Sequence, residues 1–293
     1  MKPLIHFILL SVIGLSSVNA SENYNVEKDI VFKQLDDKTI KLDLYTPKIK
    51  QQGDRPLLVW VHGGAWKRGS KDAIPTKNPL LLNSVLREGY TLAMVNYRLS
   101  GEASFPAPVE DINDAINYLH QHAKQYQISA DNIVIMGRSA GGHLANLIGA
   151  SNTVSHIGFY KKPEYKVSAV VSFFGPTDIL ALGNKGKRPT TAGSSVSRFL
   201  GTIPSQAPEL AKQASPTYYI SEKSPAFMML HGDLDRRVPL DQSVKMKALL
   251  DKYGVDNKLL IEKGVGHSAP IFDTNKYVPD VVSFIKAQLP IRK

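Results

Sequence analysis

Hydrophobic residues along this chain follow two kinds of pattern. Near the start, Ile40, Leu42 and Leu44 alternate with polar residues, and segment 29–45 predicts two early strands, the second of them half-buried. Farther along, apolar residues form continuous runs with β-branched side chains, which is typical of strands buried on both faces. These runs cover residues 56–61, 90–96, 132–136, 167–174 and 226–230.

Helical patterns lie between these runs. In the clearest one, apolar residues recur at spacings of three and four, which places them on one helix face. They are Val109, Ile112, Ile116, Leu119 and Ala123. Strands that alternate with helices predict an α/β fold with a mostly parallel central sheet and helices on both faces. Active sites in such folds lie at the carboxyl ends of the strands.

One stretch, residues 181–220, breaks this alternation. It is rich in glycine and proline and contains only short apolar pieces. We interpret it as an excursion over the sheet edge that contributes a wall of the substrate pocket. Because the chain shows neither an internal repeat nor a low-complexity tract, we expect residues 21–293 to form a single domain.

The first twenty residues have the pattern of a signal peptide. Lys2 precedes an apolar run from Leu4 to Leu15, and small residues follow up to Ala20. The run is shorter than the roughly 20 residues that a membrane-spanning helix needs. We therefore expect cleavage after Ala20, a periplasmic or secreted protein, and no stable membrane anchor.

Charge and cysteine content exclude several kinds of protein, namely those with disulfides, those with a lipid-modified cysteine and those with a basic arm for nucleic acid. The 293 residues carry a net charge of +10 and include no cysteine, so neither a disulfide nor a lipid-modified cysteine is available. Removal of residues 1–20 leaves 35 basic and 26 acidic residues. The basic residues are scattered and form no run of the kind that binds nucleic acid, so we expect a solvated basic surface and no nucleic-acid partner.

The strongest chemical signal is the sequence Gly137-Arg138-Ser139-Ala140-Gly141. This G-x-S-x-G pattern follows an apolar strand and opens a helical stretch, as a nucleophile elbow requires. A tight turn from strand to helix presents the serine hydroxyl, and it needs small residues two positions away on either side. The pattern predicts that Ser139 is a nucleophile.

A second motif, His62-Gly63-Gly64-Ala65-Trp66, follows the predicted strand at 56–61. Paired glycines let the backbone approach a substrate and direct N–H groups at developing negative charge. We predict an oxyanion hole formed by the backbone N–H groups of Gly63, Gly64 and Ala140. Trp66 is a candidate for the pocket wall.

Serine needs a neighbouring base, and the base needs an acid that fixes its tautomer. His267 lies on a glycine-flanked loop after a late apolar run and is the candidate base. Asp235, which follows the strand at 226–230, is the candidate acid. The alternatives for the acid are Asp233, Asp241 and Asp178, and a turn or a helix cap is the simpler interpretation of Asp178.

Other titratable residues have simpler explanations than catalysis. Glu110 and Asp111 begin a helix, where negative charge is favourable. No spaced cluster of ligands accompanies His62 or His231, so both are expected to order loops. The sequence predicts no metal site and no cofactor, since it contains no glycine-rich phosphate loop.

Taken together, these motifs resemble the α/β-hydrolase esterases with an HGGxW loop. That family includes bacterial carboxylesterases, feruloyl and acetylxylan esterases, and kynurenine formamidases, and the likeness covers residues 29–289. It implies the α/β-hydrolase fold, whose chain order of nucleophile, acid and base is the one found here. The resemblance assigns these roles to Ser139, Asp235 and His267, and the oxyanion glycines to Gly63 and Gly64.

The chain departs from the lipase-like relatives at Ala65, where they have a third glycine. This difference favours short or aromatic acyl esters over esters of bulky tertiary alcohols. The leading hypothesis is therefore a secreted serine hydrolase that forms an acyl-enzyme and cleaves small-molecule or carbohydrate esters. An amide hydrolase acting on arylformamides or small peptides, and a catalytically silent binding protein, are the alternatives; the oligomeric state stays open.

Overall fold

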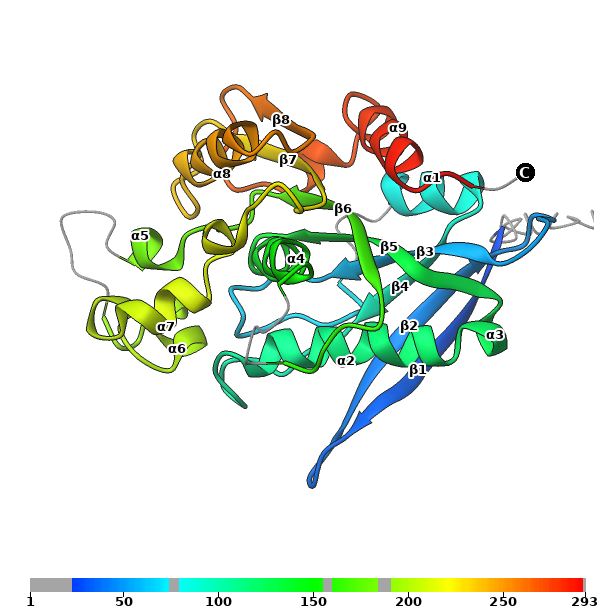
Figure 1. The fold of residues 1–293 in the computed structure, drawn as a ribbon, viewed down its shortest axis with the longest axis horizontal. Coiled ribbons are helices and arrows are strands. Elements are labelled where there is room, and N and C mark those ends of the chain that lie inside the picture. Colours follow the sequence, from blue (N-terminus) through cyan, green and yellow to red (C-terminus); the bar gives the residue numbers. More distant parts are fainter. Residues whose placement is uncertain (1–22, 74–78, 155–159, 184–190, 292–293) are drawn as a thin grey trace, which may run out of the picture.

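Eight strands join in one sheet in the computed structural model, which describes residues 23–73, 79–154, 160–183 and 191–291 (Figure 1). The predicted signal peptide at residues 1–20 lies outside the described residues. The order of strands across the sheet is β1-β2-β4-β3-β5-β6-β7-β8. Their bounds are β1 Tyr24–Gln34, β2 Thr39–Pro47, β3 Arg55–Val61, β4 Thr91–Val95, β5 Ile128–Arg138, β6 Lys166–Phe173, β7 Ala226–Gly232 and β8 Asn257–Glu262.

Most neighbouring strands in this sheet run parallel. Only β1 with β2 and β2 with β4 are antiparallel, and every pair from β4 to β8 is parallel. The crossovers need helices, since parallel neighbours cannot be joined by a short hairpin. The predicted α/β class and the mostly parallel sheet are confirmed.

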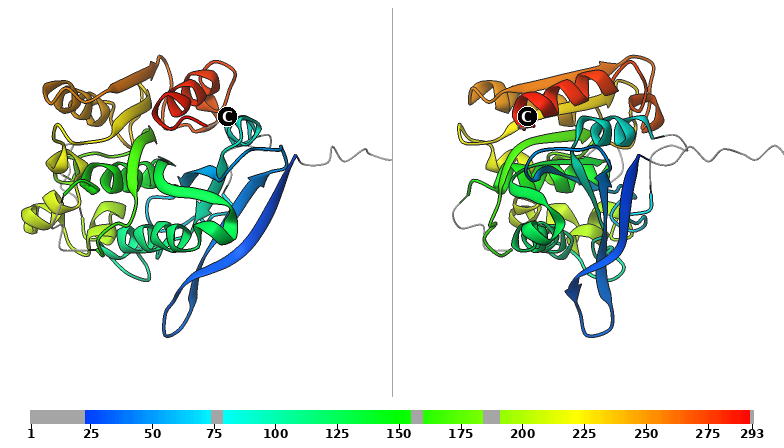
Figure 2. Two further views of the ribbon diagram at one scale, coloured as in Figure 1. Left: turned by 45° about the vertical axis from the view of Figure 1, so that its right-hand side comes forward. Right: turned by 90° about the vertical axis from the view of Figure 1, so that its right-hand side faces the viewer.

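Helices cover both faces of the sheet. On one face α2, α4 and α8 pack against one hydrophobic cluster, and on the other α1 and α9 lie side by side over a second cluster (Figures 1 and 2). The bounds are α1 Leu80–Glu88, α2 Ala107–Gln121, α3 Ala123–Tyr126, α4 Ala140–Ser151, α5 Ile179–Gly183, α6 Ser195–Leu200, α7 Pro208–Gln213, α8 Asp241–Lys252 and α9 Val278–Gln288, with short 3-10 turns at Pro204–Gln206, Pro216–Tyr219 and Pro270–Phe272.

Burial on both faces explains the continuous apolar runs. In β3, Val59 belongs to the cluster under α2 and α4, whereas its neighbours Leu58 and Trp60 belong to the cluster under α1 and α9. Successive side chains of a strand point to opposite faces, so both residue parities must be apolar when both faces are covered. The half-buried alternation predicted for β2 is wrong over Leu42–Tyr45, where Asp43 and Tyr45 are buried too, because β2 lies between β1 and β4 and Asp43 pairs with Lys71 at 2.8 Å.

The helix predicted from the 109–123 pattern ends earlier than expected. The four apolar residues Val109, Ile112, Ile116 and Leu119 lie on the buried face of α2. This helix stops at Gln121, and Ala123 belongs to the separate short helix α3. The backbone of His122 leaves the helical region (φ −104°, ψ 16°), and its Nδ1 lies 2.8 Å from the Tyr118 carbonyl. The apolar spacing continues across this break, so periodicity alone does not reveal it.

Asp111 does more than place negative charge near a helix start. Its carboxylate is fully buried and accepts bonds from Nε and Nη2 of Arg98, each at 2.8 Å, and from Lys33 Nζ at 2.7 Å. Glu110 lies 3.1 Å from Arg98. This network joins β1, the segment after β4 and α2, which is a larger structural role than the sequence interpretation gave.

The glycine- and proline-rich stretch that was expected to cross the sheet edge folds into α5, α6, α7 and two 3-10 turns. Its apolar residues Phe199 and Ala214 join the cluster beneath α4. Backbone bonds such as Phe105 N to Phe199 O (2.6 Å) fix it beside the segment before α2. The described part of this stretch therefore packs mainly over α4. The strands that it connects, β6 and β7, lie inside the sheet and not at its edge.

In the described part of the chain, no helix is long and apolar enough to cross a membrane.

Candidate functional site

Ser139 occupies the sharp turn between β5 and α4. Its backbone has φ 52° and ψ −121°, a conformation that residues with a side chain rarely adopt. Two bonds hold this geometry: Ser139 N donates to the Phe173 carbonyl at 2.8 Å, and His143 N donates to the Ser139 carbonyl at 2.9 Å. Hydrogen bonds with β6 and with the first turn of α4 therefore hold Ser139 in this unfavourable backbone conformation.

The two glycines of the motif have a steric cause in the structure. A Cβ added at Gly137 would lie 2.4 Å from the Gly141 carbonyl oxygen, and one added at Gly141 would lie 2.2 Å from the Val61 carbonyl oxygen. Both separations are far below van der Waals contact. The turn can form only when α4 approaches the ends of β3 and β5 this closely.

His267 bridges Ser139 and Asp235. Its Nε2 lies 2.8 Å from Ser139 Oγ and its Nδ1 lies 2.6 Å from Asp235 Oδ2. The three residues follow β5, β7 and β8, so the parallel sheet brings them to one edge across 128 residues of sequence. The structure thus joins the three residues that the motifs singled out into one hydrogen-bonded chain.

The carboxylate of Asp235 is buried and held in place by backbone. Its Oδ1 accepts the N–H groups of Arg237 and Val238, each at 2.9 Å. Burial raises its pKa, but the hydrogen bonds with His231, His267 and the Val238 amide outweigh this and hold the pKa well below the usual range. Asp235 is therefore a fixed negative charge that accepts the Nδ1 proton of His267.

The three alternative acids lie in other surroundings. Asp233 Oδ1 accepts the Gly264 N–H at 2.7 Å, and Asp178 Oδ1 accepts the Ala181 N–H at 2.8 Å in the first turn of α5. Asp241 lies in the first turn of α8, near Lys245. None of them is hydrogen-bonded to His267 in the described structure.

The glycine loop after β3 approaches Ser139 closely. A Cβ at Gly63 would lie 3.5 Å from Ser139 Cβ and 2.8 Å from the Arg138 carbonyl, and one at Gly64 (φ 129°) would lie 1.8 Å from the Arg68 carbonyl. Among the described residues, no loop or turn bond between backbone groups uses the N–H of Gly63 or Gly64.

Ala140 is the first residue of α4, where N–H groups have no partner within the helix, and no described loop bond uses its N–H either. Gly63, Gly64 and Ala140 all line the cavity beside Ser139, and the N-terminal, positive end of α4 begins there. Such a space can accept a negatively charged oxygen.

His62 orders this loop, as expected from the sequence. Its Nδ1 lies 2.8 Å from the Gly63 carbonyl and its ring stacks on Tyr97 at 4.3 Å, while the Tyr97 hydroxyl donates to the His62 carbonyl at 2.9 Å. Burial lowers the pKa of His62 to about 4. His62 is neutral at pH 7, and Nδ1 carries the proton that it donates to Gly63.

Trp66 lines the cavity but is mostly a packing residue. Its ring is buried, stacks on Phe199 at 4.6 Å and donates Nε1–H to Nδ1 of His143 at 3.2 Å. His143 in turn donates Nε2–H to the Ala214 carbonyl at 2.7 Å. Trp66 thus connects the glycine loop to α4 and to the segment between β6 and β7.

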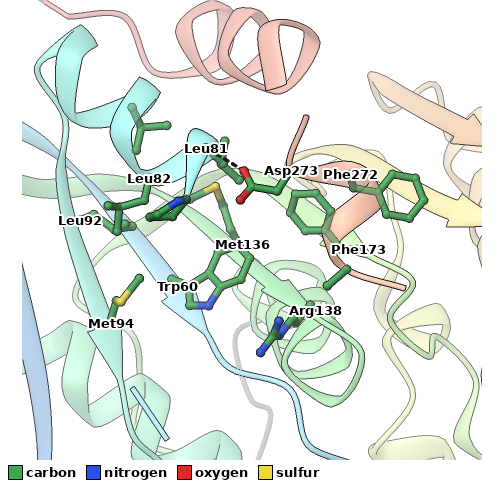
Figure 3. A pocket seen from close by; sticks show the side chains of 13 residues that line it. Trp60, Leu81, Leu82, Leu92, Met94, Met136, Arg138, Phe173, Phe272 and Asp273 are labelled. Carbon is green, nitrogen blue, oxygen red and sulfur yellow. Dashed lines mark hydrogen bonds between the residues drawn. The ribbon is translucent and has the colours of Figure 1, made fainter. Parts of the chain in front are cut away.

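A cavity of about 840 Å³ opens beside Ser139 and His267. Loops after β3, β5 and β7 line it, together with residues 194–196. Figure 3 shows a second, apolar pocket between α1 and the sheet, around Trp60 and Phe173. Arg138 and Ala269 line both spaces, so the apolar pocket adjoins the cavity at these two residues.

Sequence reasoning missed two contributors to this cavity. Phe174 has φ 43° and meets the His267 ring edge to face at 4.5 Å, and Arg237 lines the cavity from the loop that holds Asp235. Phe174 ends an apolar run and so has the pattern of an ordinary core residue.

The described residues contain no group of three His, Cys, Asp or Glu side chains that could hold a metal ion.

Comparison with known proteins agrees with this geometry. The BD-FAE family matches residues 42–250. Among curated proteins, the chain is 30% identical over 219 residues to esterase LipQ of Mycobacterium tuberculosis, which covers 73% of this chain and 50% of that protein. It is 27% identical over 234 residues to a probable isoprenylcysteine alpha-carbonyl methylesterase of Arabidopsis thaliana, covering 78% and 48%. The chain spans about half the length of these relatives.

Solved structures give the same picture for the fold. A truncated carbohydrate esterase from gut microbiota is 27% identical, with a TM-score of 0.80 over 92% of this chain and 98% of that one. An acetyl ester-xyloside bifunctional hydrolase from Caldicellulosiruptor lactoaceticus, 21% identical, covers 89% and 96% with a TM-score of 0.71 and shows the shared fold. The α/β-hydrolase fold and the resemblance to esterases are confirmed, and the chain belongs to the BD-FAE family.

Proposed function

We propose that this protein hydrolyses carboxylic esters through an acyl-enzyme formed on Ser139. The observation that carries the proposal is the hydrogen-bonded chain from Ser139 Oγ through His267 to Asp235. The esterase names of relatives along most of this chain support the same reaction class.

The proposed reaction follows from the position of each group. His267 Nε2 takes the Oγ proton as Ser139 attacks the ester carbon, and Asp235 keeps the other ring proton on Nδ1. The carbonyl oxygen becomes negative and receives the N–H groups of Ala140, Gly63 and Gly64. His267 then protonates the departing alcohol, and a water molecule attacks the acyl-enzyme by the same steps in reverse order.

For the substrate, we propose small-molecule or carbohydrate esters with short or aromatic acyl groups. The carbohydrate esterase among the similar structures supports a sugar ester, and Ala65 in place of a third glycine supports a modest acyl group. The N-terminal pattern of residues 1–20 supports export to the periplasm or the medium. The proposal requires no cofactor, metal, nucleic acid or stable membrane anchor.

The deciding experiment measures hydrolysis of 4-nitrophenyl acetate, butyrate and octanoate by the mature protein and by Ser139→Ala. We expect turnover by the natural protein, a rate that falls with acyl length, and almost complete loss in the variant. Circular dichroism establishes that the variant is folded.

A fluorophosphonate reagent gives a second readout, because it should add its mass to the natural protein and not to Ser139→Ala. Equal hydrolysis by both proteins would refute the role of Ser139. Hydrolysis of an aryl formamide without hydrolysis of any ester would favour the amide alternative.

A further inference from the structure

The side chains that line the cavity beside Ser139 carry a net positive charge. Four cationic side chains line it, and its lining includes no Asp or Glu among the described residues. The four are Lys67 and Arg68 from the loop after β3, Arg138 from the end of β5, and Arg237 from the loop after β7. Three separate loops thus bring positive charge to the place where the substrate would bind.

Arg138 is the most informative of these residues. It is half-buried, and the one hydrogen bond recorded for its side chain in the described structure runs from Nη2 to the Ala73 carbonyl at 3.3 Å. Arg98 is also partly buried, yet its guanidinium meets the carboxylates of both Asp111 and Glu110. The fold therefore pairs one such arginine with acids and leaves the other facing a cavity.

Partial burial of a guanidinium costs free energy unless acceptor groups receive its hydrogen bonds. Burial lowers the pKa of Arg138, and no neighbouring carboxylate offsets that effect. The planar group presents several N–H donors in an arrangement that matches a carboxylate, which it binds through two parallel bonds. Arg138 lines the same cavity as Ser139, and it also borders the apolar pocket beside α1.

Arg237 adds a second cationic side chain on a stretch of backbone that is held in place. Its backbone N–H donates to Asp235 Oδ1 at 2.9 Å, so the chain position of Arg237 is tied to the acid of the hydrogen-bonded chain. Lys67 and Arg68 are exposed at the same opening. A concave site with walls of one sign concentrates ligands of the opposite sign.

We propose that the preferred esters of this protein carry a carboxylate group, held by Arg138 and Arg237 while the ester lies against Ser139. This inference rests on the proposed ester hydrolysis and adds its substrate class. The carboxylate can belong to the acyl part, as in a half-ester of a dicarboxylic acid, or to the alcohol part, as in an acylated uronic acid. Both sources present the same group to the same arginines.

Two pairs of substrates separate these sources. In the first pair, mono-4-nitrophenyl glutarate is compared with 4-nitrophenyl pentanoate, which has an acyl chain of equal length and no charge. In the second pair, an O-acetylated methyl glucuronoside is compared with the O-acetylated methyl glucoside. We expect kcat/KM to favour the charged member of one pair by about tenfold or more at low salt, since a charge-assisted bond contributes roughly 1.5–3 kcal/mol. Added NaCl should reduce this preference.

Substitutions assign the preference to the named residues. Arg237→Gln should reduce the ratio of charged to neutral kcat/KM by about two- to fivefold, the range for an exposed charge pair. Arg138→Gln should reduce it by about tenfold, and Arg138→Lys should restore only part, because an ammonium cannot form the paired bonds.

Arg236→Gln is the matched control for these variants. Arg236 is the exposed neighbour of Arg237, has the same charge and does not line the cavity. Its substitution should keep the preference of the natural protein.

The outcomes distinguish this inference from the proposed function. Equal kcat/KM within both pairs, with the neutral esters turned over, overturns the carboxylate inference and leaves ester hydrolysis intact. An equal loss of preference in Arg236→Gln and Arg237→Gln assigns the effect to net charge and overturns the site. If no ester is hydrolysed at all, both proposals fail.

Discussion

Trp66 and His143 meet through one hydrogen bond, in which the indole Nε1–H donates to Nδ1 of the imidazole at 3.2 Å. Because indole nitrogen only donates, this bond fixes the proton of neutral His143 on Nε2, which bonds to the Ala214 carbonyl. The glycine loop, α4 and the segment between β6 and β7 are thus held together at one point. Loss of the indole N–H leaves a buried acceptor without a partner.

Trp66→Phe should therefore lower the free energy of unfolding by about 1–3 kcal/mol, the usual cost of a buried unsatisfied group. The matched control is Trp60→Phe, because Nε1 of Trp60 has no hydrogen-bond partner among the described residues. Urea titrations of both variants give the comparison. If the two substitutions cost the same, packing alone explains the role of Trp66.

Asp235→Asn should reduce kcat for ester hydrolysis by about three to four orders of magnitude, because an amide does not hold the His267 proton on Nδ1. Asp233→Asn is the control, since its side chain bonds to the Gly264 N–H and not to His267. Rates with 4-nitrophenyl acetate, taken beside circular dichroism spectra, test both. A similar loss in the two variants contradicts the assignment of Asp235.

The free energy of unfolding should fall as the pH drops below 6.5, the ordinary pKa of histidine. Burial lowers the pKa of His143 from 6.5 to about 4, against the effect of its bond to Ala214. Between these values the unfolded chain binds a proton that the folded protein does not, so this stability is present above pH 6.5 and is lost toward pH 4. The slope reaches at most about 1.4 kcal/mol per pH unit.

His143→Gln tests this linkage, because glutamine does not titrate. The free energy of unfolding of the variant should change less between pH 6.5 and 4.5 than that of the natural protein, measured by urea titration at each pH. His62 shifts in the same direction, so part of the slope should persist in the variant. Parallel curves for the two proteins are the contrary result.

Gly137→Ala should abolish hydrolysis or prevent folding, because the new methyl group would lie 2.4 Å from the Gly141 carbonyl. Gly101→Ala is the contrasting substitution, since nothing lies within 4 Å of the added atom and its φ is not positive. We expect the latter to stay within about 0.5 kcal/mol of the natural protein. Soluble yield, thermal unfolding and esterase rate are the three readouts.

Much of the fold could be predicted because its physical causes are local in sequence. Strands buried on both faces must be apolar at every position, so the runs at 56–61 and 226–230 identify β3 and β7 directly. The helix break at His122 could not be predicted in this way, because the apolar face continues across it into α3. The packing of 191–220 over α4 depends on contacts such as Phe199 with His143, which no spacing encodes.

In the candidate site, too, some residues could be identified from the sequence and others could not. Ser139 and its glycines could be identified because the turn imposes steric demands on its immediate neighbours. Asp235 could not be separated from Asp233 by spacing alone, since the choice depends on which carboxylate reaches His267 in space. The unpaired guanidinium of Arg138 is visible only once its surroundings are known.

The position of His267 couples the chemistry of the site to the integrity of the core. His267 follows β8, which is the last strand both along the sequence and across the sheet. The segment after it contributes Phe272, Val281 and Ile285 to the hydrophobic cluster shared with α1. A chain cut before Gly264 therefore loses the group that takes the serine proton in the proposed mechanism and, with it, part of the core, so such a fragment has neither the complete site nor the complete fold.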